Sequence, residues 1–187
     1  IIPRHDDDGL EVFPKFAGDE CDLNEVCEKL KIKEEVFEAI PTQKVVLYTD
    51  GACSGNPGLG GFGAILIHNG KQKIVSGGEE NTTNNRMELM AVISGLEAIK
   101  VPCEVDVFSD SAYVVNAFLQ NWIVSWQAKG WKTAGGNEVL NIDLWKRLLV
   151  QVEKHKVSWH KVKGHADNEL NNACDEIARK EIDKLRN

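Results

Sequence analysis

The chain has 187 residues, of which 42% are hydrophobic and 27% are charged, and its formal net charge is −7. This composition indicates a globular protein, and no apolar run approaches the roughly 20 residues that span a membrane, so we expect no membrane partner. The five cysteines lack a paired Cys-x-x-Cys spacing, which argues against a disulfide framework or a zinc site. We therefore predict a cytoplasmic protein, or one of another reducing compartment inside the cell, and we expect a monomer.

The first 41 residues form a predicted acidic extension. Residues 1–40 carry 5 basic and 12 acidic side chains, which accounts for the whole net charge of −7. The acidic run at 6–8 predicts a partly flexible segment. Farther on, Asp22-x-x-Glu25 resembles a capping box ahead of helical spacing, and Pro41 ends the pattern. We predict a short helical pair that docks on the main domain or binds a protein partner.

A predicted strand over 44–50 opens the main domain and ends at Asp50. We expect a turn rich in glycine over 51–61, then strands over 62–68 and 71–78 joined by Asn69-Gly70. The glycines at 58–63 fit a dinucleotide-binding pattern, but that motif needs a helix that begins at the glycines. Because the sequence predicts strand, turn and strand here, we reject nucleotide binding by this motif.

Helices and strands alternate through the rest of the chain. We predict helices over 84–100, 111–120, 141–153 and 168–185, strands over 103–109 and 156–160, and a tryptophan-bearing segment over 121–137. The first three strands suit an antiparallel meander, whereas strands separated by helices join as parallel neighbours. The predicted fold is an α/β domain over 42–187, with a five-stranded mixed sheet (three antiparallel strands plus two parallel) flanked by helices.

Three carboxylates stand out in this pattern. Asp50 and Asp110 each follow a predicted strand, and Glu88 lies in an apolar turn of the helix after Thr83. Asp50 also suits a turn, Asp110 a helix N-cap, and Glu88 an ion pair with Arg86. Strand ends of an α/β sheet normally carry the site, and clustered carboxylates repel one another unless cations hold them together. The set therefore predicts a site for Mg²⁺ or Mn²⁺.

Two further titratable residues follow the last predicted strand. His165 lies in a polar loop with Gly164, where proton transfer is plausible, although a lone loop histidine is more often a solvated surface residue. Asp175 lies on the terminal helix, where an acidic residue is usually a surface charge.

Five motifs in order resemble the type 1 ribonuclease H family over about residues 43–185. They are Tyr-Thr-Asp-Gly-Ala-Cys-Ser-Gly-Asn-Pro-Gly at 48–58, Thr-Asn-Asn-Arg-Met-Glu-Leu at 83–89, Ser-Asp-Ser at 109–111, Lys-Val-Lys-Gly-His at 161–165 and Cys-Asp-Glu-Ile-Ala at 174–178. The resemblance implies the ribonuclease H-like fold and hydrolysis of the RNA strand of RNA/DNA hybrids, with 5′-phosphate and 3′-hydroxyl products. Residues 1–40 are not covered and show no sign of the family's N-terminal hybrid-binding module.

The resemblance also implies a role for individual residues. Two divalent cations, Mg²⁺ with Mn²⁺ as a substitute, would be held by Asp50, Glu88, Asp110 and Asp175 in a two-metal mechanism. His165 would assist proton transfer or product release. Residues at the hybrid's minor groove would read the 2′-hydroxyls; they are Gly51, Cys53, Asn56, Asn84 and Asn85. Thr83 and Asn141 match positions that hold a phosphate of the DNA strand.

The segment 121–132 resembles the substrate-binding protrusion of the same family. Its tryptophans, Trp122, Trp126 and Trp131, would pack the protrusion or flank the DNA strand, and packing is the favoured role for at least two of them. The positive residues between 121 and 140 are Lys129 and Lys132. This protrusion is less basic than usual, which predicts weaker binding with a flatter salt dependence. Ala112 stands where relatives often have a glutamine that contacts the hybrid.

Two rival interpretations remain at this stage. The chain lacks an initial Met, which suits a ribonuclease H domain excised from a reverse transcriptase, although the turn at 56–58 and the protrusion resemble the free-standing cellular enzyme. The other rival is a non-catalytic domain that binds hybrids, and the presence of all four carboxylates counts against it.

Overall fold

The computed structural model of the protein describes residues 43–163 and 168–187. The predictions for residues 1–41 and for His165 lie outside this range, and the domain boundary near residue 41 stays a prediction. The described elements are, in chain order, β1 (Lys44–Gly55), β2 (Gly58–His68), β3 (Lys71–Thr82), α2 (Asn84–Glu97), β4 (Glu104–Ser109), α3 (Ala112–Leu119), α4 (Trp122–Ala128), α5 (Ile142–Lys154), β5 (Lys156–Lys161) and α6 (Glu169–Arg186).

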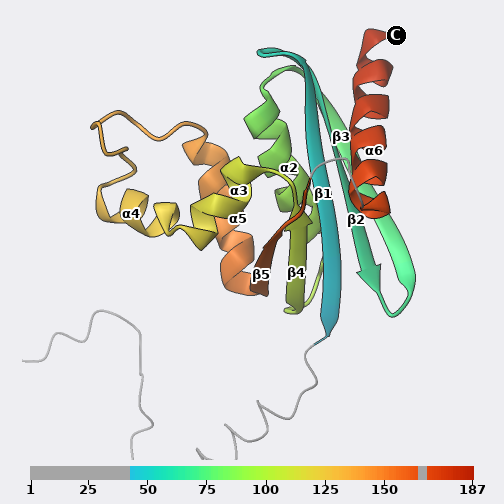
Figure 1. Cartoon of the computed structure of the whole chain (residues 1–187), viewed down its shortest axis with the longest axis horizontal. Coiled ribbons are helices and arrows are strands. Elements are labelled where there is room, and N and C mark those ends of the chain that lie inside the picture. Colours follow the sequence, from blue (N-terminus) through green and yellow to red (C-terminus); the bar gives the residue numbers. More distant parts are fainter. Residues whose placement is uncertain (1–42, 164–167) are drawn as a thin grey trace, which may run out of the picture. The chain divides into compact units, whose positions relative to one another are not determined.

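The five strands form one mixed sheet in the order β3-β2-β1-β4-β5 (Figure 1). β1 pairs antiparallel with β2, and β2 with β3, whereas β4 runs parallel to both β1 and β5. From β1 the chain passes through β2, β3 and α2 before it reaches β4. Parallel neighbours require a crossover connection of this kind. The predicted fold class is confirmed, including the division into three antiparallel and two parallel strands.

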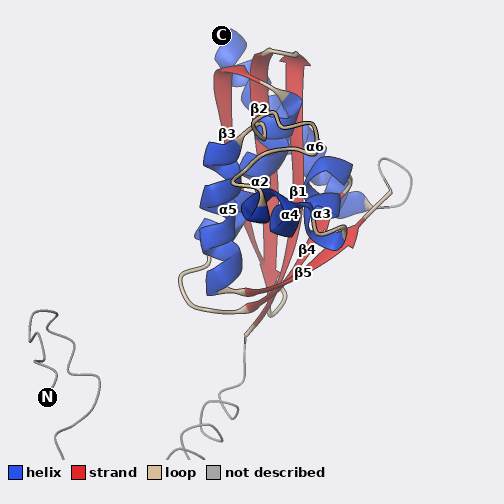
Figure 2. Ribbon diagram, turned by 90° about the vertical axis from the view of Figure 1, so that its left-hand side faces the viewer, coloured by secondary structure: helices blue, strands red, loops and turns tan. Residues whose placement is uncertain are grey.

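Helices cover both faces of the sheet. In Figure 1, α6 stands at the right of the sheet, while α3, α4 and α5 lie to its left, and Figure 2 shows the same layers turned by 90°. The main core lies under α2, α3 and α5, and its largest fully buried side chains include Trp145, Leu47, Leu89, Ile93, Leu96 and Leu148. Within the described residues, every helix is too short or too polar to cross a lipid bilayer.

The predicted glycine-rich turn over 51–61 is wrong. β1 continues to Gly55 and β2 begins at Gly58, so that only Asn56 and Pro57 connect the two strands. Glycines inside a strand often mark a place where another backbone approaches closely. Here a Cβ atom on Gly61 would collide with a carbonyl oxygen of α6, and one on Gly63 would lie 2.6 Å from the Cys174 carbonyl oxygen. The glycines therefore let α6 pack directly on β2.

The predicted hairpin at Asn69-Gly70 is confirmed. Asn69 has φ of 49° and Gly70 has φ of 74°, the left-handed values that a tight turn between two antiparallel strands requires. The glycines at 58–63 thus lead into a strand and a hairpin, with no helix at the glycines. This is the geometry on which the rejection of dinucleotide binding rests.

Candidate active site

Asp50 and Asp110 lie beside each other because two parallel strands are in register. Thr49 of β1 pairs with Ser109 of β4. The residue that follows each of them is an aspartate, so the two carboxylates lie at the same edge of the sheet. The sequence predicted Asp50 at the end of its strand, but in the structure this residue lies within β1. The Gly51 amide donates a hydrogen bond of 2.8 Å to Asp50 Oδ1. The alternative role of Asp110 as a helix cap is excluded, since Ser111 is the N-cap of α3 and its hydroxyl accepts from Val114 N.

Glu88 reaches this edge because α2 packs closely against β1. A Cβ atom on Gly51 would collide with the backbone of Met87 and Glu88. Thr83 begins the helix as its N-cap, which places Glu88 in the second turn, with 6% of its surface exposed. The alternative of a pair with Arg86 is excluded, because that guanidinium pairs with Asp143 at 2.9 Å.

The three carboxylates form one compact cluster. Asp50, Glu88 and Asp110 each offer an oxygen, and these oxygens all lie within 4.8 Å of one another. Burial, followed by the negative charge of Asp110, raises the pKa of Asp50 to about 7. Burial, followed by the charges of Asp50 and Asp110, also raises the pKa of Glu88 well above its usual range. Buried like charges disfavour ionisation, so this cluster favours a compensating positive charge.

Asp175 is not part of this cluster. It lies on α6 with 20% of its side chain exposed, and Arg179 donates to it from one turn farther along at 2.9–3.0 Å. Its negative charge nevertheless contributes to the raised pKa of Asp50, and the charge of Arg179 counteracts that rise. The structure therefore brings three of the four predicted metal ligands together and places the fourth beside them, in an ion pair.

The sequence analysis missed Asn171 as a member of the site. Its Nδ2 donates to Asp110 Oδ2 at 3.4 Å, its side chain is 1% exposed, and its Oδ1 has no hydrogen-bond partner among the described residues. The signal in the sequence was the spacing, because Asn171 precedes Asp175 by four residues and so shares its helix face. A second neighbour is Cys174, a free thiol whose pKa burial raises to about 12.

The donor set of this cluster fits a hard divalent cation. All its donors are carboxylate oxygens, which Mg²⁺ and Mn²⁺ prefer. Glu88 Oε2 is buried and, among the described residues, has no hydrogen-bond partner. A buried oxygen of this kind is costly unless a ligand satisfies it. The residues present therefore match the predicted cation site.

The residues predicted to read the minor groove lie along the β1–β2 hairpin and the start of α2. Asn56 Oδ1 accepts a hydrogen bond of 3.2 Å from the Asn84 amide, which joins the hairpin turn to the helix. The Cys53 thiol donates to the Thr82 carbonyl at 3.4 Å. Asn84 and Asn85 are exposed, whereas Gly51 is buried under α2. Asn84, Asn85 and Asn56 thus offer side chains at one surface, and Gly51 serves packing.

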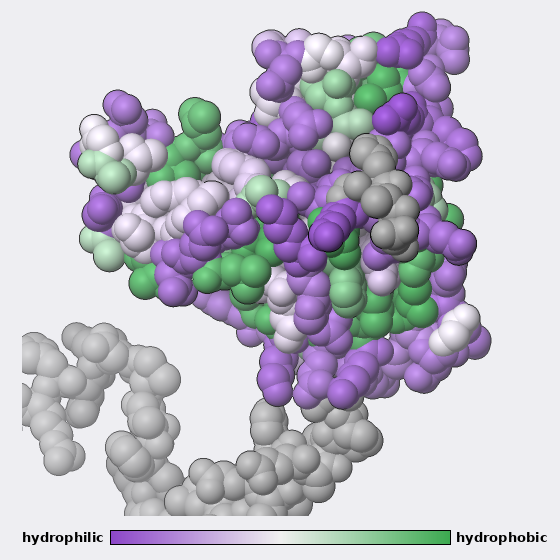
Figure 3. Space-filling model, viewed as in Figure 1, coloured by the Kyte–Doolittle hydropathy of each residue, from purple (hydrophilic) through white to green (hydrophobic). Residues whose placement is uncertain are grey.

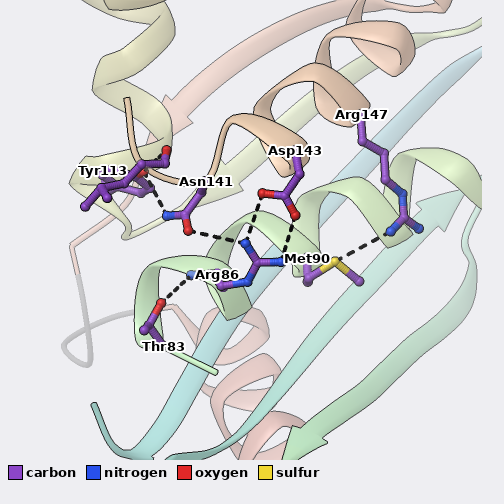
Figure 4. Close-up of polar contacts among 8 residues, drawn as sticks. Thr83, Arg86, Met90, Tyr113, Asn141, Asp143 and Arg147 are labelled. Carbon is purple, nitrogen blue, oxygen red and sulfur yellow. Dashed lines mark hydrogen bonds and ion pairs between the residues drawn. The ribbon is translucent and has the colours of Figure 1, made fainter. Parts of the chain in front are cut away.

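Thr83 and Asn141, the predicted phosphate contacts, belong to one polar network around Arg86 (Figure 4). The Thr83 hydroxyl accepts from the Arg86 amide, and the Arg86 guanidinium donates to Asn141 Oδ1 at 3.4 Å and to both oxygens of Asp143. Asn141 Nδ2 in turn donates to the Tyr113 hydroxyl at 3.1 Å. These contacts join the start of α2 to the start of α5 through Arg86.

The predicted protrusion is built on α4. All three of its tryptophans are half-buried and pack against the main core, and Trp126 lies edge-on to Trp145 with ring centroids 5.4 Å apart. Lys129 and Lys132 are exposed. Figure 3 shows polar and apolar residues mixed over this projection at the left of the view, without one continuous hydrophilic surface. Packing is therefore a role of every tryptophan, which agrees with the expectation for at least two of them.

The fold and this acidic edge define an α/β protein with a cluster of carboxylates whose geometry suits a cation. The family described as RNase H matches residues 42–183. The ribonuclease H of Acetivibrio thermocellus is 59% identical over 142 residues, which cover 76% of this chain and 97% of that protein. The ribonuclease H of Caldicellulosiruptor saccharolyticus is 59% identical over 144 residues, 77% of this chain and 99% of that protein. The chain belongs to the ribonuclease H family, and it is an enzyme of the hydrolase class.

Solved structures agree with this assignment. LC9-RNase H1, described as a type 1 RNase H with the type 2 active-site motif, superposes with a TM-score of 0.70 at 32% identity, over 78% of this chain and 74% of that one. LC11-RNase H1, solved in complex with RNA/DNA hybrid, has a TM-score of 0.61 at 24% identity, over 76% of this chain and 99% of that one. The second likeness concerns the fold alone.

Proposed function

We propose that this chain cleaves the RNA strand of RNA/DNA hybrids endonucleolytically and leaves 5′-phosphate and 3′-hydroxyl ends. The observation that carries the proposal is the convergence of Asp50, Glu88 and Asp110 within 4.8 Å at one buried edge of the sheet. The names of the relatives support the choice of substrate.

Asp50, Glu88, Asp110 and Asp175 would hold two divalent cations, Mg²⁺ with Mn²⁺ as a substitute. When bound, such cations neutralise negative charge on the attacking and leaving oxygens of a phosphodiester. Glu88 Oε2, which has no hydrogen-bond partner among the described residues, is available for this role. Asp175 would join by leaving Arg179, and since that pair is partly exposed, its loss costs no more than about 1 kcal/mol. Asn171 would orient Asp110 through their hydrogen bond.

The hybrid would lie across the hairpin and the start of α2. Asn56, Asn84 and Asn85 would contact the minor groove there, with Cys53 beside them, and a 2′-hydroxyl is the group that distinguishes RNA from DNA. Thr83 and Asn141 would hold a DNA-strand phosphate, and the protrusion with Lys129 and Lys132 would lie along that strand. We assign His165 to proton transfer or product release, so His165→Ala should slow turnover less than the loss of a carboxylate does.

The direct test is cleavage of one labelled RNA strand in three forms: single-stranded, in an RNA/RNA duplex and in an RNA/DNA hybrid. Each form is incubated with Mg²⁺ and with a chelator. We expect cutting of the hybrid alone, only with Mg²⁺, and products whose 3′ ends a polymerase can extend.

Asp110→Asn and Glu153→Gln make a matched pair for this test. Both remove one negative charge with little change in shape, but Glu153 is exposed on α5, remote from the cluster. We expect no cleavage but measurable hybrid binding for the first, and full activity for the second. If folded wild-type protein binds the hybrid and never cuts it, the chain is instead a non-catalytic binding domain.

A further inference from the structure

A second feature lies at the opposite end of β1 from the carboxylates. It is a pocket of about 280 Å³ between the start of β1, the β2–β3 hairpin and the loop after α2. Its apolar lining includes Val45, Leu66, Ile99 and Val101, and we call it the lysine-rimmed pocket because Lys71, Lys73 and Lys100 also line it. Val45 and Asp50 are five residues apart on one strand, which separates the pocket from the site by roughly 16 Å.

The pocket exists because α2 ends before it reaches the edge of the sheet. The helix stops at Glu97, so Lys73, the β3 partner of the buried Leu66, is left exposed beyond its end. Val101, just beyond the helix, is 52% exposed. Val45, Leu66 and Ile99 are 6%, 7% and 8% exposed, so they form a mostly buried floor whose exposed apolar part is Val101. Apolar surface with a polar rim is typical of interaction sites.

The charged residues that line this floor are all lysines. All three lysines are exposed, and none forms an ion pair with another described residue, whereas the lining contains no acidic residue among those described. The nearest histidine, His68, has both ring nitrogens engaged, with the Lys44 carbonyl at 2.8 Å and the Asn69 side chain at 3.1 Å. The rim thus offers the ammonium groups of Lys71 and Lys73 to a ligand, together with that of Lys100, which also donates to the Glu97 carbonyl oxygen at 3.4 Å.

We propose that the lysine-rimmed pocket binds an acidic segment of a partner protein. One apolar side chain of that segment occupies the floor, and its carboxylates lie on the lysines. An acidic peptide satisfies both features, because charge complementarity steers the encounter while a buried apolar anchor holds the complex. A nucleic acid satisfies only the rim, since a phosphodiester backbone has nothing to place against four aliphatic side chains. The distance from the carboxylates leaves the hybrid and the peptide free to bind together.

Binding of a defined probe to the full chain tests this proposal. The probe is a fluorescein-labelled peptide of four aspartates followed by leucine and phenylalanine, with anisotropy measured at about 0.15 M ionic strength. We expect saturable binding with a micromolar dissociation constant. Replacing the two apolar residues of the probe by serine, or its aspartates by asparagine, should each weaken binding at least tenfold. Equal binding of the serine peptide overturns the proposal.

Variants of the rim and the floor locate the probe. Lys73→Glu and Lys100→Glu should each weaken binding roughly tenfold, and Val101→Ser should weaken it severalfold, while hybrid cleavage stays unchanged. Lys180→Glu is the matched control, since it makes the same charge change at an exposed position of α6 and should leave binding intact. Retained binding by both rim variants overturns the proposal.

Two competitors distinguish other occupants. If single-stranded DNA displaces the probe from the wild type, and if Lys73→Glu weakens the binding of that DNA, the pocket is a nucleic-acid site. A synthetic peptide of residues 22–40 of this chain is the second competitor. If it displaces the probe and binds more tightly than the probe does, the occupant of the pocket is the chain's own acidic extension. Either result overturns the assignment to a partner protein.

Discussion

At the scale of single residues, the site works against the stability of the fold. Asp50 and Glu88 are 7% and 6% exposed and lie with Asp110 in one cluster. Their raised pKa values report the cost of keeping several negative charges together away from water. The chain tolerates this cost because the same oxygens suit a cation.

We therefore predict that Asp50→Asn stabilises the metal-free protein while it abolishes cleavage. The rise in the pKa of Asp50 from 3.8 to about 7 sets an upper limit of about 4 kcal/mol on the gain near pH 8. Urea unfolding in chelator measures the gain, with Glu153→Gln as the control. A destabilised Asp50→Asn protein would contradict the repulsion that we assign to the cluster.

The difference in unfolding free energy between Asp50→Asn and the wild type should depend on pH. Because the folded-state pKa of Asp50 is raised, the native protein holds the proton where the unfolded chain has lost it, so stability falls as the pH rises from about 4 to about 7. The difference in unfolding free energy between Asp50→Asn and the wild type should be near zero below pH 4 and grow to its plateau above pH 7. A difference independent of pH would show that the variant acts through packing.

The sequence predicted the residues of the site better than their contacts. Asp50, Glu88 and Asp110 could be identified because strand ends and apolar helix faces restrict where a carboxylate can point. The pair of Asp175 with Arg179 could not be predicted, since an i, i+4 acidic–basic pair is equally common on any solvated helix. Asn171 was missed because asparagine near the start of a helix normally signals a cap, and here Asn168 fills that role.

At the scale of elements, glycines decide how closely the helices approach the sheet. Gly51 leaves room for the backbone of α2, and Gly61 and Gly63 leave room for α6. Alternate residues of a strand point to opposite faces of the sheet. Gly51 therefore lies on the face that α2 covers, and Asp50 lies on the face that α6 covers. Gly51 and Gly61 were assigned to a turn because glycine is unfavourable in strands, and the helices that pack on them in the folded protein explain their presence there.

Gly51→Ala should therefore damage both stability and activity. The added methyl group collides with the backbone of Met87 and Glu88, so α2 must shift and take Glu88 with it, at a cost of about 1–3 kcal/mol. Gly135→Ala is the control, because its nearest neighbouring atom is 3.9 Å away. Thermal unfolding and hybrid cleavage measure the two effects, and wild-type behaviour of Gly51→Ala would disprove the close packing.

The protrusion on α4 leads to a prediction about salt. Lys129 and Lys132 are the positive residues between 121 and 140, and each neutralised phosphate adds about 0.9 to the slope of log K against log salt. Lys129→Gln with Lys132→Gln should flatten that slope by at most about 2. Hybrid binding is measured from low to moderate salt with Asp50→Asn protein, to prevent cleavage. An unchanged slope would remove the protrusion from the binding surface.

At the scale of the whole molecule, cation binding and folding are linked. A ligand that binds only the folded state stabilises it by about 2.7 kcal/mol at 100 times its dissociation constant. We expect Mg²⁺ to raise the midpoint of thermal unfolding of the wild type and chelator to reverse the rise. Asp50→Asn should give little or no response, and an equal response from it would place the cation elsewhere.

The carboxylates also come from distant parts of the chain. Asp50 and Asp175 stand 125 residues apart, and α6 packs closely on the sheet at Gly61 and Gly63. During synthesis on a ribosome, β1, α2 and β4 emerge first, and the fourth carboxylate follows last. With Asp175 in its proposed role as the fourth ligand, a nascent chain therefore has no complete set of carboxylates until α6 has left the ribosome.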